Sequence, residues 1–195
     1  MSLDSPTLLP RPRRADALRN RERVIAAAAE VFAAKGVDAG VPEIAQRAGV
    51  GKATVYRSFP SKEHLVAAVA VERLEWVTGL ATAALSREDA GAAFLDVIIT
   101  IAEQQASDSA VAGALAADID LPELHAARAT TQAALEALVD RGRAAGDLRP
   151  DATAEELRVL LTGVSEVLRA DAVRDTAVWR RYGLLVADAL RAQHA

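Results

Sequence analysis

The side chains best equipped for chemistry lie between residues 43 and 62, in the stretch EIAQRAGVGKATVYRSFPSK. Its lysine, arginine, tyrosine, serine and threonine side chains all donate hydrogen bonds, and the lysines and arginines also carry positive charge. Groups of this kind bind the phosphates of duplex DNA and the edges of its bases. We therefore expect DNA contacts from Lys52, Ala53, Thr54, Tyr56, Arg57, Ser58 and Lys62.

Two helices and a tight turn must position these side chains. Ile44, Ala45 and Ala48 share one face at helical spacing. Gly49 follows where this helix must stop, because glycine takes the left-handed conformation after a helix with little strain. Gly51 then stands where a second helix can begin.

The second helix divides into an inner and an outer face. Val55 and Phe59 are four residues apart and point to a core, so Thr54 and Arg57 must face outward. Pro60 ends the helix. This layout is typical of a helix-turn-helix that reads double-stranded DNA. The alternative is an ordinary helical hairpin with a solvated basic face.

The residues from about Asn20 to Leu65 resemble the DNA-binding domain of TetR-type transcriptional regulators. The stretch RERVIAAAAEVFAAKG resembles the family's first helix, and VPEIAQRAGVGKATVYRSFPSKEHL resembles its second, third and the start of its fourth. Gly40 and Gly51 stand where the family often has serine or threonine. The resemblance covers about the first third of the chain.

The resemblance implies a sequence-specific transcriptional regulator that binds a palindromic operator as a homodimer. It also implies a helical effector-binding domain, and most simply a repressor that a small molecule releases from DNA. The alternative is a constitutive DNA-binding dimer whose body contacts a partner without any small-molecule effector. A cavity among the middle helices would favour the first alternative, and a solid core would favour the second.

The distribution of charge supports a division of the chain. Residues 1–65 contain 11 Lys and Arg against 7 Asp and Glu, a net charge of +4, whereas residues 66–195 contain 12 against 20, a net charge of −8. A basic N-terminal part orients the molecule toward a polyanion. We predict a flexible basic arm over 1–18, the helix-turn-helix domain over 19–65 and a helical ligand-binding and dimerisation domain over 66–195. The arm either reaches a minor groove or has no fixed contact.

Composition predicts an all-α fold, and the resemblance implies an N-terminal three-helix DNA-binding domain followed by a helical-bundle effector-binding and dimerisation domain. Hydrophobic residues make up 51% of the chain and aromatic residues only 4%, alanine is abundant, and no run alternates like a strand. After the recognition helix, Ser86 and Asp89 outline a capping box. Beyond the helix-turn-helix, we expect helices at about residues 20–35, 61–85, up to 105, 107–118, 122–145, 153–170 and 176–193.

Several classes of function are not expected. The chain has no cysteine and only three scattered histidines, and it has no catalytic or phosphate-binding motif. We therefore predict no catalytic residues, no metal, no cofactor and no enzymatic activity. No apolar run is long enough to span a bilayer, and the N-terminus has no secretory signal. We expect a cytoplasmic protein, associated with the nucleoid and not with a membrane.

The last two expected helices are strongly apolar on one side and could form a four-helix interface with a second copy. Packing on their own core is the other interpretation, and both can hold. The interface residues that we predict are Leu157, Leu161, Val164, Leu168, Trp179 and Leu185.

The middle helices carry apolar residues with a few polar groups, the mixture that a ligand pocket needs. We predict a pocket for a small, largely apolar effector, although a tryptophan or phenylalanine on a helical stripe is more often plain core than a ligand wall. The pocket residues that we predict are Trp76, Phe94, Ile98, Gln105, His125, Arg128 and Thr131.

Overall fold

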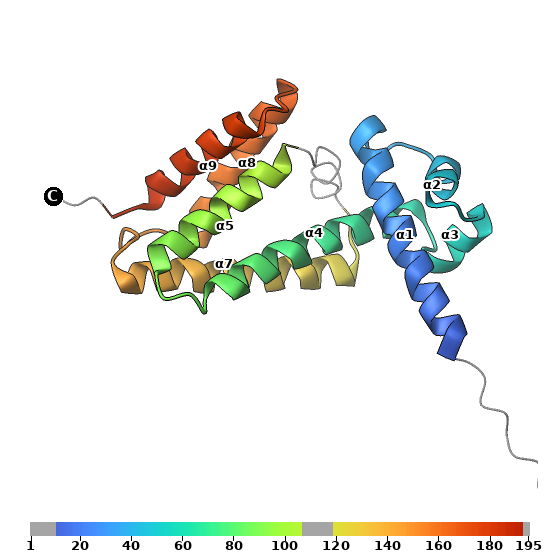
Figure 1. Cartoon of the computed structure of the whole chain (residues 1–195), viewed down its shortest axis with the longest axis horizontal. Coiled ribbons are helices and arrows are strands. Elements are labelled where there is room, and N and C mark those ends of the chain that lie inside the picture. Colours follow the sequence, from blue (N-terminus) through green and yellow to red (C-terminus); the bar gives the residue numbers. More distant parts are fainter. Residues whose placement is uncertain (1–10, 107–118, 193–195) are drawn as a thin grey trace, which may run out of the picture.

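The computed structural model describes residues 11–106 and 119–192. Within these ranges all regular elements are helices, apart from one isolated bridge between Leu148 and Arg191 (Figure 1). The all-α prediction is therefore confirmed. The helix expected over 107–118 lies outside the described residues. The helices are α1 (Arg11–Lys35), α2 (Val41–Ala48), α3 (Lys52–Ser58), α4 (Lys62–Ala84), α5 (Ala90–Gln105), α7 (Pro122–Ala145), α8 (Ala154–Ala170) and α9 (Thr176–Leu190).

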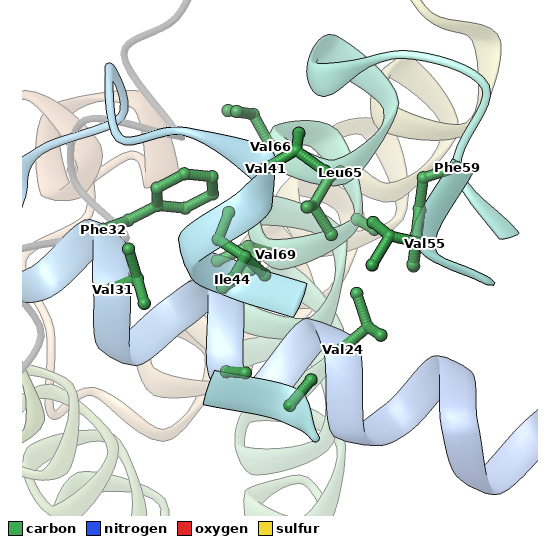
Figure 2. Close-up of a cluster of buried hydrophobic side chains, with 14 of the residues drawn as sticks. Val24, Val31, Phe32, Val41, Ile44, Val55, Phe59, Leu65, Val66 and Val69 are labelled. Carbon is green, nitrogen blue, oxygen red and sulfur yellow. The ribbon is translucent and has the colours of Figure 1, made fainter. Parts of the chain in front are cut away.

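An N-terminal core joins α1, α2, α3 and the first half of α4. Its largest side chains come from all four helices and meet around Ile44, which is fully buried (Figure 2). Val55 and Phe59 point into this core, as their spacing predicts. Burial of this apolar surface holds the two short helices α2 and α3, which would not be stable alone, against α1 and α4.

A second core fills the body between α4, α5, α7, α8 and α9. The most extensive pairings are α4 along α7 and α5 along α9 (Figure 1). At Gly183 of α9, an added Cβ would lie 2.8 Å from the Cβ of Ala102 on α5. The absence of a side chain at this glycine therefore lets the two helices approach closely.

The helix α4 belongs to both cores. Leu65 to Ala70 are buried in the N-terminal core, whereas Ala81 and Ala84 are buried in the body. The N-terminal core also takes Leu124 from the first turn of α7. Two helices of the body thus extend into the packing of the helix-turn-helix.

Several predicted helix ends are confirmed. Gly49 and Gly146 adopt φ of 65° and 81° after α2 and α7, in the left-handed region that glycine tolerates. The Thr153 hydroxyl accepts a hydrogen bond from the backbone N–H of Glu156 and caps α8. The final helix ends at Leu190 rather than near residue 193.

Two expectations are wrong. The helix α1 begins at Arg11 rather than near Asn20, so residues 11–18 of the expected arm are helical; Pro12 is compatible with this start, because the N–H groups of a first turn have no helical partner. Residues 1–10 lie outside the described residues. The cap of α5 is Asp89, whose carboxylate accepts from the N–H of Ala92 at 2.8 Å, whereas the Ser86 hydroxyl donates to the Ala83 carbonyl at the end of α4.

Candidate nucleic-acid interface

The outer face of α3 carries the side chains predicted to contact DNA. Val55 is buried against the core, and the opposite face exposes Lys52, Ala53, Tyr56 and Arg57. The remaining predicted residues are half-buried: Thr54, Ser58 and Lys62. The fold therefore brings all seven together on α3 and the first turn of α4, and their contact with DNA stays a prediction.

Lys52 and Tyr56 form a unit at the N-terminal end of this face. The Nζ atom of Lys52 lies 5.7 Å from the centre of the Tyr56 ring, within the range of a cation–π interaction. The Tyr56 side chain remains 43% exposed, so its hydroxyl can still reach a phosphate. The pair presents a positive charge and a neutral donor side by side.

Two arginines of α1 hold the motif in place, and the sequence analysis missed both. Arg21 donates to the Ser58 carbonyl at 3.2 Å, and its guanidinium lies 4.4 Å from the Phe59 ring centre. Arg23 donates to the Ala48 carbonyl at 2.6 Å. Both cations thus sit at helix C-termini, where unpaired carbonyls and the helix dipole favour positive charge. The signal that could have found them is two arginines spaced i and i+2 ahead of the apolar stripe of α1.

The other charges near the motif are mostly paired within the protein. Lys35 forms an ion pair with Glu43, and Arg47 forms one with Glu30. In the first turn of α4, a hydrogen bond from Ser61 lowers the pKa of the Glu63 carboxyl, so this acid stays ionised beside Lys62. The cations of the outer face are therefore Lys52, Arg57 and Lys62.

The body contains a cavity of about 770 Å³ between α4, α5, α7 and α8. Its walls include apolar residues at Leu74, Val77, Ile101, Ala129, Leu135 and Leu161, together with polar and charged residues. This volume lies in the range of small-molecule sites, which are mostly apolar with a few polar groups. The prediction of a pocket among the middle helices therefore corresponds to a real space in the structure.

Three predicted pocket residues line this cavity: Gln105, Arg128 and Thr131. The other four do not. Phe94 and Ile98 are 2% and 0% exposed and fill the body core, two turns and one turn before the part of α5 that faces the cavity. Trp76 packs under the guanidinium of Arg73, and His125 is exposed and lies 2.9 Å from Asp120. The structure does not place these four residues at this cavity.

The predicted dimer residues are mostly internal to the protomer. Leu157, Leu168 and Trp179 are buried in it, and Leu161 and Val164 are half-buried, because the inward stripe of each helix fills its own core. Only Leu185 is strongly exposed, at 54%. Direct contact with a partner through the three buried residues is therefore excluded in this conformation.

A different apolar surface lies on the outside of the last two helices. Val159 and Val167, two turns apart on α8, and Tyr182 and Leu185, one turn apart on α9, are all exposed. We call these four residues the outer α8–α9 stripe. Large apolar side chains exposed on two helices that contact each other make this outer side a candidate interaction surface. The sequence signal that could have revealed this surface is a second row of apolar residues on α8 and α9, on the side opposite the buried row.

Two general observations concern the described part of the chain. None of its helices combines the length and apolarity needed to cross a bilayer. No three histidine, aspartate or glutamate side chains gather there in a way that could hold a metal ion.

Two family models together cover most of the chain. Residues 24–69 match the bacterial regulatory proteins of the tetR family, and residues 89–192 match the C-terminal domain of SbtR-like transcriptional regulators. The first range contains the helix-turn-helix, and the second contains most of the cavity and the outer α8–α9 stripe. The matching families are transcriptional regulators rather than enzymes.

Individual relatives agree with these matches. A TetR transcription regulatory protein from Mycobacterium vanbaalenii is 36% identical, with 93% of this chain and 100% of that chain covered and a TM-score of 0.67. A TetR regulator from Streptomyces coelicolor is 29% identical, with 89% and 99% covered and a TM-score of 0.68.

A curated relative, the uncharacterized HTH-type transcriptional regulator TtgW of Pseudomonas putida, is 45% identical over 60 residues. That match covers 30% of this chain and 45% of the relative, less than two thirds of its length. The helix-turn-helix geometry, the family match over the body and the similarity to solved regulators along nearly the whole chain agree. The chain therefore belongs to the TetR family of transcriptional regulators.

Proposed function

We propose that this regulator is a repressor that binds a palindromic operator as a homodimer and leaves it when a small molecule enters the body cavity. The observation that carries the proposal is the course of α4. Its first turns are buried in the core of the helix-turn-helix, and its Arg73, Leu74 and Val77 line the cavity. One continuous helix therefore connects the space for a ligand to the element that positions α3.

On DNA, the outer face of α3 divides into two roles. Thr54 and Arg57 lie one turn apart and can reach base edges in the major groove, where arginine pairs with guanine. Lys52, Tyr56 and Lys62 would hold phosphates, which position the protein without selecting sequence. Ala53 and Ser58 lie beside these residues on the same helix.

The homodimer is proposed to form through the outer α8–α9 stripe. Two copies that place these helices against each other would bury four exposed apolar side chains per protomer and build a four-helix interface. The resulting two-fold axis relates two α3 helices, and a symmetric pair of reading helices requires a symmetric operator. Such a protein acts where the genomic DNA lies, and we propose a cytoplasmic location for it.

A polar joint between α4 and α7 offers a route for the ligand signal. The Thr131 hydroxyl of α7 lies 3.1 Å from the Leu74 carbonyl of α4 and 3.0 Å from the Thr78 hydroxyl. Thr131 is 6% exposed, and both it and Leu74 line the cavity. These buried hydrogen bonds tie α4 to α7, and breaking them costs free energy. A ligand that pushes on this wall would therefore move α4 as a rigid helix rather than bend it locally.

The test combines ligand binding with release of DNA. DNA selected by the protein from a random library serves as operator, and a panel of small molecules is screened for an increase in melting temperature. Compounds that stabilise the protein should weaken operator binding, because a ligand shifts the equilibrium only if it binds the DNA-free conformation better.

Stabilising compounds that leave operator affinity unchanged would argue against the coupling. They would favour the alternative of a constitutive DNA-binding dimer. The presence of a cavity of ligand size is the observation that favours the effector-responsive alternative.

A further inference from the structure

The charged groups around the body cavity are mostly hydrogen-bond donors, whereas its threonine, serine and glutamine side chains can both donate and accept. Among the described residues its lining includes four guanidinium groups and one carboxylate, that of Glu166. Arginine donates hydrogen bonds and accepts none. The charged residues of the lining therefore favour binding of an anion over binding of a cation. The four arginines are Arg73, Arg128, Arg158 and Arg169.

Gln105 extends this bias, because its neighbours determine how its amide is oriented. Its Oε1 accepts a hydrogen bond from the Ser165 hydroxyl and another from Arg169 Nη1 at 3.2 Å. A guanidinium can only face the oxygen of an amide, so the NH₂ group of Gln105 is the part left for a ligand. The Gln105 amide can therefore add hydrogen-bond donors to those of the arginines.

Arg169 is the best placed of the four arginines. Its side chain is only 16% exposed, and it is held by Glu166 at 2.6 Å and by Gln105. A fixed, half-buried guanidinium interacts with an anion more strongly than an exposed one, since less water screens the charge. By contrast, Arg158 is 52% exposed and pairs with Glu155 at the rim.

The rest of the wall is hydrocarbon. Leu74, Val77 and Ile101 come from α4 and α5, and Leu135 and Leu161 come from α7 and α8. A purely polar anion would leave these side chains against water, and a purely apolar ligand would desolvate the arginines without replacing their hydrogen bonds. The lining thus matches a molecule with an apolar body and one anionic end.

We infer that the cavity takes an anionic amphiphile, a hydrocarbon chain with a carboxylate or phosphate headgroup bound near Arg169 and Gln105. The inference rests on the proposed effector site and specifies its ligand class. It replaces the expectation of a largely apolar effector. Carboxylate and phosphate both present a pair of acceptor oxygens that a guanidinium group can bind with two hydrogen bonds, and the test distinguishes them.

The experiment compares four probes with the same tail: dodecanoate, dodecyl phosphate, 1-dodecanol and dodecylamine. Binding to the full chain is measured by calorimetry, with each probe below its micelle concentration. At least one anion should bind about ten-fold more tightly than the alcohol, as one charge-assisted hydrogen bond would give, and the amine should bind most weakly. Whichever anion binds more tightly identifies the headgroup.

Three variants locate the effect. Arg169→Gln should remove the advantage of the anion over the alcohol while the alcohol keeps its affinity. Arg158→Gln at the rim should reduce the advantage less, and it serves as the second variant if Arg169→Gln does not fold. Arg180→Gln is the matched control, because Arg180 pairs with Glu103 and does not line the cavity; its preference for the anion should remain unchanged.

Equal binding of the anion and the alcohol, tighter binding of the amine, or no binding of any probe would overturn the inference. A preference for the anion that survives both Arg169→Gln and Arg158→Gln would overturn it as well. Operator release, measured in parallel by fluorescence anisotropy, tests the proposed function separately. An alcohol that binds as tightly as the anions and releases DNA would contradict only the ligand class, whereas an anion that binds without releasing DNA would contradict only the repressor mechanism.

Discussion

The individual residues on and around α3 differ in the contacts that their side chains make. Val55 and Phe59 are buried in the core, and Arg21 donates to the backbone at the end of the helix. Arg57, in contrast, is exposed on the outer face. Its guanidinium is therefore available for a base edge, whereas Lys62 lies outside α3, in the first turn of the next helix.

Arg57→Ala and Lys62→Ala should change DNA binding in different ways. Loss of Arg57 should relax the preference at one or two positions of each half-site, because a good bidentate contact discriminates by about 1–3 kcal/mol. Loss of Lys62 should weaken binding to all sequences alike and reduce the salt dependence by about one unit per subunit. Binding selections and salt titrations on both variants provide the measurement.

The assignment of these roles fails if Arg57→Ala retains the wild-type sequence preference while Lys62→Ala alters it. Arg47→Ala is a suitable control, since Arg47 is paired with Glu30 and lies on α2 rather than on the outer face of α3.

Among the elements, the pairing of α5 with α9 depends on a close approach. At Gly183→Ala the new methyl group would lie 2.8 Å from the Cβ of Ala102, too near for ordinary contact, so the helices must separate. We expect a loss of about 1–3 kcal/mol in the free energy of unfolding, typical of overpacking. Urea denaturation at a fixed protein concentration measures it.

Gly79→Ala is the matched control for this prediction. Gly79 lies within α4, is exposed, and has nothing within 4 Å of an added Cβ. Alanine there should stabilise the protein by about 0.5–1 kcal/mol, because it restricts the unfolded chain and suits a helix better than glycine. Equal effects of the two substitutions would show that the contact between α5 and α9 is not as close as described.

At the scale of the whole molecule, the outer α8–α9 stripe should decide the oligomeric state. Leu185→Arg places a charge in the middle of the proposed interface without touching the core, since Leu185 is 54% exposed. We expect a folded monomer in sedimentation velocity, together with much weaker binding to a full operator. Leu161→Arg is a poorer test, because Leu161 lines the cavity.

Leu18→Arg is the control for the dimer prediction, because Leu18 is 61% exposed but lies on α1, far along the chain from the stripe. It should sediment as the wild type does. A Leu185→Arg variant that remains a dimer would place the interface on another surface.

The sequence by itself determined the local features of this protein. Gly49, Gly51, Val55 and Phe59 specify the turn and the inner face of α3 through neighbours only a few residues away, so the helix-turn-helix could be recognised before any packing was known. The same holds for the bounds of α7, which Pro122 opens and Gly146 closes.

Only the tertiary structure decided how the helices use their faces. Leu157 and Leu185 look alike in an apolar stripe, yet one is buried in the protomer and the other is exposed. Phe94 and Gln105 share a helix, but only Gln105 reaches the cavity. These outcomes depend on contacts between residues far apart in the chain, and helical periodicity specifies which residues share a face without specifying what that face meets.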